Sequence, residues 1–203
     1  MPKIIMVLCL LLTGLANEIA LAAESPQELV KRTAQEMQAA LRENRQTLEA
    51  DPTKIYGLVN QIVLPHFDFT LMSRWVLGKY WRQATPEQRR QFTEEFRTLL
   101  VRSYAGALLE YADEELIFPP GPDLPPDAEE ATVHSEVQPK GEDPVAINYS
   151  LRKRDGKWKV YDVTVNGVSL VINYRSTFAN QIRNEGIDAV IRDLKERNLQ
   201  GKA

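Results

Sequence analysis

The chain has 203 residues, of which 43% are hydrophobic and 26% charged, a composition that excludes an intrinsically disordered protein and suits one well-packed domain. Its formal net charge is -3, and Lys and Arg alternate with Asp and Glu along the sequence. Because no basic stripe is formed, the composition argues against nucleic acid as a partner.

The first 23 residues have the pattern of a secretory signal peptide. Lys3 precedes an apolar run, and small alanine residues follow at Ala20, Ala22 and Ala23. The run is shorter than the ~20 apolar residues that a transmembrane helix needs. The only cysteine, Cys9, lies in this segment, so the mature chain is expected to hold no disulfide and no thiolate site. We predict export to a bacterial periplasm, with residues 24–203 as a single domain that carries a helical extension.

The first half of the mature chain is predicted to be helical. Ser25, Asp51 and Thr85 are each followed by a proline and then by apolar residues at helical spacing, which is the sequence pattern of a capped helix start. Gly78 is a plausible C-terminal cap. The predicted helices span residues 26 to about 48, 52–63, 67–77 and 86–111.

After residue 111 the spacing changes to that of strands. Prolines between residues 119 and 126 mark a loop, and strands are predicted at residues 131–138, 144–154 and 157–165. Asp155-Gly156 indicates a two-residue hairpin turn. A tight turn pairs Leu151 with Val160, Tyr149 with Asp162 and Ile147 with Thr164, which places Val163 and Val165 on the face opposite to Tyr149.

The C-terminal part returns to helical spacing. Asn166-Gly167 is a predicted turn, residues 168–183 form a helix that Gly186 ends, and a last helix closes the chain. Helices, then an antiparallel sheet, then helices is the order of an α+β fold.

Candidates for chemistry are few. His66 and His134 have no acidic neighbour at ligand spacing and are interpreted as surface or hydrogen-bonding residues, and Ser169 is interpreted as a cap or turn residue. No motif for a metal or another cofactor is present. Asp162 points inward on the predicted register, so it is either a general base or a carboxylate that is satisfied by a hydrogen bond.

The segment VLGKYWRQATPEQR, residues 76–89, carries a family signature. It resembles the VLG-x-Y-(Y/W)-(K/R)-x-ATP-x-QR pattern of the MlaC / toluene-tolerance family of periplasmic phospholipid-binding proteins. Residues 158–163, 167–170 and 186–188 also match this family, so the resemblance covers nearly all of the mature chain. The pair Tyr80-Trp81 departs from the two tyrosines that the family often has, which bears on the local shape of the cavity.

The resemblance implies a small antiparallel sheet of the NTF2-like type, wrapped by helices around a lipid cavity, with a helical lobe. It implies a monomeric carrier, with no enzymatic activity and no cofactor, that maintains outer-membrane lipid asymmetry. Its partners would be phospholipid, the lipid-binding ring of an inner-membrane ABC transporter and an outer-membrane lipoprotein-porin complex.

Exposing two acyl chains of roughly fifteen methylenes each to water costs on the order of 24 kcal/mol, so a carrier must shield both chains. The residues expected to line the lipid cavity are Trp81, Phe96, Leu100, Tyr104, Val145, Ile147, Tyr149, Val163, Val165, Val168, Val171 and Tyr174. Two alternatives stay open, an NTF2-like isomerase or dehydratase with Asp162 as base and a periplasmic adaptor whose helices bind other proteins.

Overall fold

The computed structural model describes residues 24–200, so the predicted signal peptide lies outside the described residues. The helices are α1 (Pro26–Glu43), α2 (Arg45–Ala50), α3 (Ile55–Leu58), α4 (Phe69–Leu77), α5 (Lys79–Gln83), α6 (Pro86–Glu110), α7 (Leu170–Glu185) and α8 (Ile187–Leu199). A π-helical turn (Val59–Val63) and 3-10 turns (Pro52–Lys54 and Leu64–His66) join the helices of the first half. The strands are β1 (Glu115–Ile117), β2 (Glu130–Gln138), β3 (Val145–Arg154), β4 (Lys157–Val165) and β5 (Val168–Ser169).

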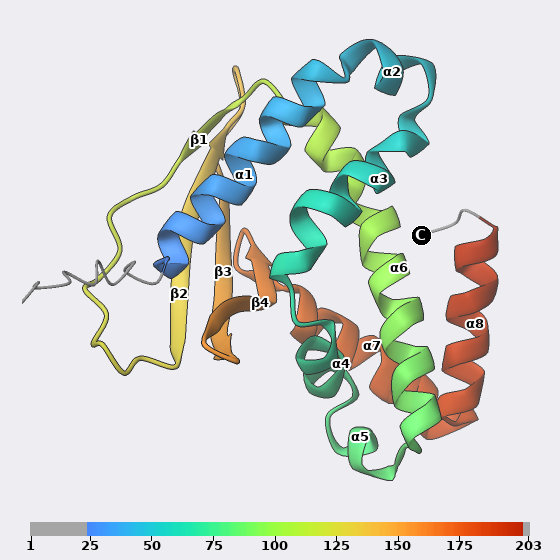
Figure 1. Cartoon of the computed structure of the whole chain (residues 1–203). Helices are drawn as coiled ribbons and strands as arrows, with labels where there is room; N and C mark the ends of the chain where they lie inside the picture. Colours follow the sequence, from blue (N-terminus) through green and yellow to red (C-terminus); the bar gives the residue numbers. More distant parts are fainter. Residues whose placement is uncertain (1–23, 201–203) are drawn as a thin grey trace, which may run out of the picture.

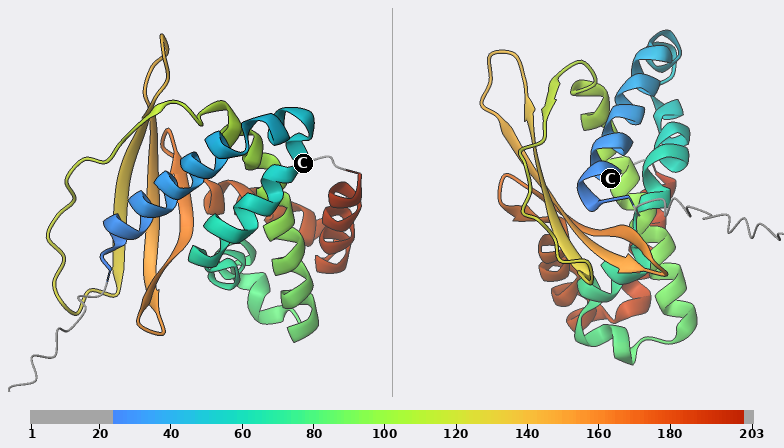
Figure 2. Two further views of the ribbon diagram at one scale, coloured as in Figure 1. Left: turned by 45° about the horizontal axis from the view of Figure 1, so that its top comes forward. Right: turned by 60° about the vertical axis from the view of Figure 1, so that its left-hand side comes forward.

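The strands form one antiparallel sheet in the order β1-β2-β3-β4-β5. Helix α1 crosses one face of this sheet, and α4, α6, α7 and α8 form a bundle beside its β4 side (Figures 1 and 2). The predicted α+β class with an antiparallel sheet is therefore confirmed. The strands β1 and β5 were not predicted, because segments of three and two residues are too short to show a period.

Two predicted capping boxes are present. Ser25 and Glu28 cap α1, and in α6 the Gln88 N–H donates to Thr85 Oγ1 at 3.2 Å while Gln88 Oε1 accepts from the Thr85 N–H at 2.9 Å. The first helix ends at Asn44 and not near Leu48. The Asn44 side-chain amide donates to the Ala40 carbonyl at 2.8 Å, and this competition with the backbone favours a helix end.

Gly78 joins two helices, of which the shorter, α5, was not predicted. It has φ +52° and ψ -120°, a backbone conformation that residues other than glycine rarely adopt. A Cβ atom at this position would lie 3.1 Å from the Arg175 guanidinium. The glycine of the VLG segment therefore permits both the sharp turn and the close approach of Arg175.

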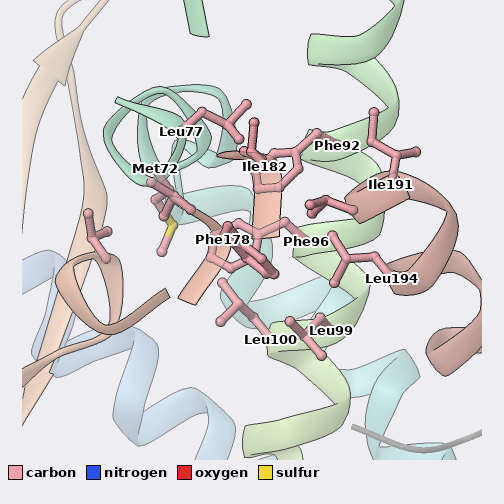
Figure 3. Packing of buried hydrophobic residues seen from close by; sticks show 13 residues of the cluster. Met72, Leu77, Phe92, Phe96, Leu99, Leu100, Phe178, Ile182, Ile191 and Leu194 are labelled. Atoms are coloured by element: carbon pink, nitrogen blue, oxygen red, sulfur yellow. The ribbon is translucent and has the colours of Figure 1, made fainter. Parts of the chain in front are cut away.

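The helical bundle has a solid aromatic core. Phe92 and Phe96 are fully buried, and their rings lie 5.5 and 6.1 Å from the ring of Phe178 in edge-to-face contacts (Figure 3). The Tyr174 ring adds an edge contact to Phe96 at 5.2 Å. Aliphatic residues from α4 and α8 close this cluster, among them Met72, Leu77, Val190, Ile191 and Leu194.

The register of β3 on β4 differs from the predicted one. The Asp155-Gly156 turn pairs Arg154 with Lys157 and Leu151 with Val160, as predicted. One extra residue on β4, Tyr161, then forms a bulge, and beyond it Tyr149 pairs with Val163 and Ile147 with Val165. The predicted pairings of Tyr149 with Asp162 and of Ile147 with Thr164 were wrong, because the prediction assumed one residue opposite each residue and so had no place for the extra one.

We predict that Gly78→Ala lowers the free energy of unfolding by about 1–3 kcal/mol, because alanine is strained at this positive φ and its Cβ crowds Arg175. Gly106→Ala is the matched control. A Cβ at Gly106, inside α6, meets nothing within 4 Å, so this change should raise stability by up to about 1 kcal/mol. Urea unfolding measures both changes, and a similar response of the two variants would contradict the assigned strain.

Candidate functional site

One half of a sheet face is apolar but only partly buried. The bulge places Val163 and Val165 beside Tyr149 and Ile147, and Val168 of β5 pairs with Val165. We call this surface the apolar face; its residues are Val145, Ile147, Tyr149, Val163, Val165 and Val168, all of them partly exposed or exposed.

The other half of the same sheet face is packed. There Leu151 and Val160 are buried in a cluster with Leu29 and Val30 of α1. The apolar face is therefore the part of this surface that α1 does not bury, and its side chains stay partly exposed.

Tyr149 lies at the boundary between the two halves. Its side chain sits deeply enough in the protein that burial raises the pKa of its hydroxyl, while the Ser135 hydroxyl nearby acts in the opposite direction. Part of the Tyr149 surface nevertheless remains accessible. Tyr149 thus brings a single neutral hydroxyl to an otherwise hydrocarbon surface.

On the helical side, a stripe along α6 leads out of the solid core. Phe96 is 0% exposed, Leu100 8% and Tyr104 37%, at successive steps of four residues. Burial and the adjacent Tyr174 hydroxyl raise the pKa of Tyr104 to about 12. The structure thus brings Tyr104 together with Tyr174 of α7, while Val171 is buried in the helical core.

Trp81 lies elsewhere, against α6 and in a groove at the α4–α5 corner. Arg89 donates from Nε to the Trp81 carbonyl at 2.8 Å, and its guanidinium lies 5.3 Å from the Trp81 ring. The groove has a volume of about 470 Å³. It is lined by Leu71, Arg74, Trp75, Gly78, Lys79, Trp81, Arg82, Arg152 and Arg175.

A second groove of about 260 Å³ shares Leu71 and Arg152 with the first. Its other lining residues are Asp68, Glu129, Lys153, Arg154 and Lys159. We call the two together the basic groove. From the sequence, Arg74, Lys79 and Arg82 are interpreted as a solvated helix face, with acidic partner surfaces or phosphate headgroups as the alternative contacts. No local pattern relates them to Arg152 or Arg175, which come from β3 and α7.

Asp162 is a helix cap and not an inward base. It lies opposite Ser150, and it accepts hydrogen bonds from Ser169 Oγ at 2.5 Å and from the Val171 N–H at 3.1 Å. Ser169 Oγ in turn accepts from the Ile172 N–H, which confirms its predicted capping role. The inward position predicted for Asp162 was wrong because of the bulge at its neighbour, whereas the alternative role, a carboxylate satisfied by a hydrogen bond, is confirmed.

The histidines take part in separate local contacts. Burial, with Arg32 and Lys159 nearby, lowers the pKa of His66, and His134 Nδ1 lies 2.7 Å from Asn148 Oδ1. Within residues 24–200, no three His, Cys, Asp or Glu side chains gather at a site that would hold a metal ion. In the same range, no helix combines the length and the apolar character needed to cross a membrane.

The chain is similar to known proteins over most of its length. A family model described as MlaC protein matches residues 31–196. The toluene tolerance protein ttg2D of Pseudomonas putida is 31% identical over 171 residues, which cover 84% of this chain and 79% of that protein. The intermembrane phospholipid transport system binding protein MlaC of Haemophilus influenzae is 26% identical over 188 residues, which cover 92% of this chain and 88% of that protein.

A solved structure is also similar. The phospholipid-binding protein from Ralstonia solanacearum, solved in complex with a phospholipid, has a TM-score of 0.79 and is 32% identical. The match covers 89% of this chain and 99% of that one, so the whole fold corresponds and not only the sheet.

We predict that Asp162→Ala destabilises the protein by about 1–3 kcal/mol, since it removes the acceptor of two hydrogen bonds at the start of α7. Asp143→Ala, in the exposed loop before β3, is the control and should change stability by less than about 0.5 kcal/mol. Urea unfolding is the measurement. Equal stability of Asp162→Ala and wild type would show that Asp162 is not a structural cap.

Proposed function

This chain belongs to the MlaC protein family, and on that premise we propose that it is a periplasmic phospholipid carrier that holds acyl chains on its apolar face. The relatives supply the ligand class, because the Ralstonia protein was solved with a phospholipid and the Haemophilus protein is named for intermembrane phospholipid transport. The predicted signal peptide supports export.

The observation that carries the proposal is the partly exposed apolar face. Its valine and isoleucine side chains offer no hydrogen bonds, so they attract hydrocarbon in proportion to the area that is buried, without fixing its orientation. Such contacts suit a carrier, since they shield acyl chains in transit and still allow them to slide out at the destination.

The proposed lipid surface has two sides. We assign the apolar face to one side and Tyr104 with Tyr174, at the exposed end of the α6 stripe, to the other. Phe96, Leu100 and Val171 are buried and form the packed layer that continues from these tyrosines into the core. Trp81 lies in the basic groove and is not assigned to this surface.

In the cell, the carrier would travel as a monomer between two membrane assemblies, without a cofactor. These are an outer-membrane lipoprotein-porin complex and the lipid-binding ring of an inner-membrane ABC transporter, and the traffic would maintain the lipid asymmetry of the outer membrane. The family membership and the transport system in the name of the Haemophilus relative support this part of the proposal.

The two alternatives have less support. The hypothesis of an enzyme with Asp162 as general base is weakened, because the Asp162 carboxylate caps α7. An adaptor that only binds proteins through its helices does not account for a sheet face that is apolar and partly exposed.

We predict that Ile147→Lys lowers the amount of phospholipid that copurifies with the protein by at least about tenfold. A charge on the apolar face must be desolvated whenever acyl chains cover it, and each 1.4 kcal/mol of that cost is a factor of ten. Lipid extraction and native mass spectrometry measure the lipid content.

Leu199→Lys is the matched control, because Leu199 is 77% exposed near the end of α8 and away from the sheet. Circular dichroism and thermal melting verify that both variants fold. Wild-type protein without lipid, or equal lipid in both variants, would refute the proposed site.

A further inference from the structure

The basic groove concentrates positive charge on a chain that is acidic as a whole. Eight basic and two acidic side chains line it, whereas the formal net charge of the chain is -3. The first of its two parts has five basic residues and no acidic one. A local field of one sign within a hollow attracts a ligand of the opposite sign.

Much of this charge is not neutralised within the protein. Arg154 forms an ion pair with Asp68 at 2.9 Å, and Arg152 lies 3.9 Å from Glu130. By contrast, none of the ion pairs within residues 24–200 includes Arg74, Arg82 or Arg175. Three guanidinium groups at one groove thus keep their capacity for carboxylate or phosphate oxygens.

The fold brings these arginines together from separate elements. Arg74 is on α4, Arg82 on α5 and Arg175 on α7, and the turn at Gly78 lets the Arg175 guanidinium approach the backbone between α4 and α5. Two tryptophans line the same groove, and Trp75 is 48% exposed. Exposed tryptophan beside arginine is the composition of energetic hot spots in protein interfaces.

The groove does not lie beside the apolar face. Arg152 and Ile147 point to opposite faces of the sheet, and they are five residues apart on β3, which corresponds to about 17 Å along the strand. Arg152 of the groove thus points away from the side on which the proposed acyl chains lie, which favours an external partner over the headgroup of a bound lipid as the occupant.

A protein partner fits the groove better than a membrane surface does. A hollow receives protruding side chains, whereas a lipid surface is contacted by residues that project from a protein. The second part of the groove also contains Glu129, which repels lipid phosphates but can accept a basic side chain. A protein surface with mainly acidic groups and some basic ones is complementary in charge to both parts of the groove.

We propose that the basic groove is the docking surface for an acidic protein surface, presented by an assembly that delivers lipid to this carrier or receives lipid from it. This inference rests on the proposed carrier function. Beyond that function, it specifies which surface of the carrier makes the contact and that the contact is between basic and acidic side chains.

The test reverses two charges and keeps the overall charge matched. Arg74→Glu/Arg82→Glu is compared with Arg183→Glu/Arg192→Glu, since all four arginines are exposed and the second pair lies on α7 and α8, outside the groove. Binding is measured to the purified lipid-binding ring, to the purified lipoprotein-porin complex and to vesicles of phosphatidylethanolamine and phosphatidylglycerol. Lipid content is measured on the same preparations.

The groove variant should bind at least one assembly at least about tenfold more weakly than wild type, with unchanged lipid content, while the control pair changes affinity less than about twofold. Added salt should weaken the wild-type interaction. Equal effects of the two pairs, no binding of wild type to either assembly, or groove-dependent binding to vesicles alone would overturn the proposal. Wild-type protein without lipid would instead count against the carrier function, so the two failures are distinguishable.

Discussion

The extra residue in β4 determines what each face of the sheet can do. The type of turn at Asp155-Gly156 sets the first pairs of the hairpin, and the bulge at Tyr161 then changes which side chains lie on which face. Val163 and Val165 join Ile147 on the apolar face, and Asp162 turns to the opposite face, where it caps α7. One inserted residue therefore both completes the proposed lipid surface and anchors the helix beside it.

The two apolar regions of the molecule have different physical roles. Phe92 and Phe96 are fully buried at the centre of their cluster, which supplies stability and packs α4, α6, α7 and α8 together (Figure 3). The apolar face is only partly buried, so part of its hydrocarbon surface stays in contact with water after folding. A protein can leave such a surface partly exposed only if the rest of its core stabilises the fold without it. The aromatic packing of the helical bundle meets that condition.

Local rules predicted much of the fold from the sequence. Capping boxes at Ser25 and Thr85 and the Asp155-Gly156 turn depend on residues within a few positions of one another, so they are visible in the chain itself. The end of α1 at Asn44 and the bulge at Tyr161 were missed. At both places the spacing of apolar residues continues on either side, so the sequence pattern predicts an unbroken helix or strand. The basic groove escaped prediction because its arginines belong to elements that meet only in three dimensions.

Helix α7 carries residues of both the proposed lipid surface and the groove. Successive residues of a helix point about 100° apart, so Tyr174 faces Phe96 and Tyr104 while the next residue, Arg175, lines the groove. The start of the same helix is held to β4 by Asp162, next to the valines of the apolar face. A partner that engages Arg175 would thus contact the helix that borders the proposed lipid surface, and Arg152 of the same groove points to the sheet face opposite to the apolar face.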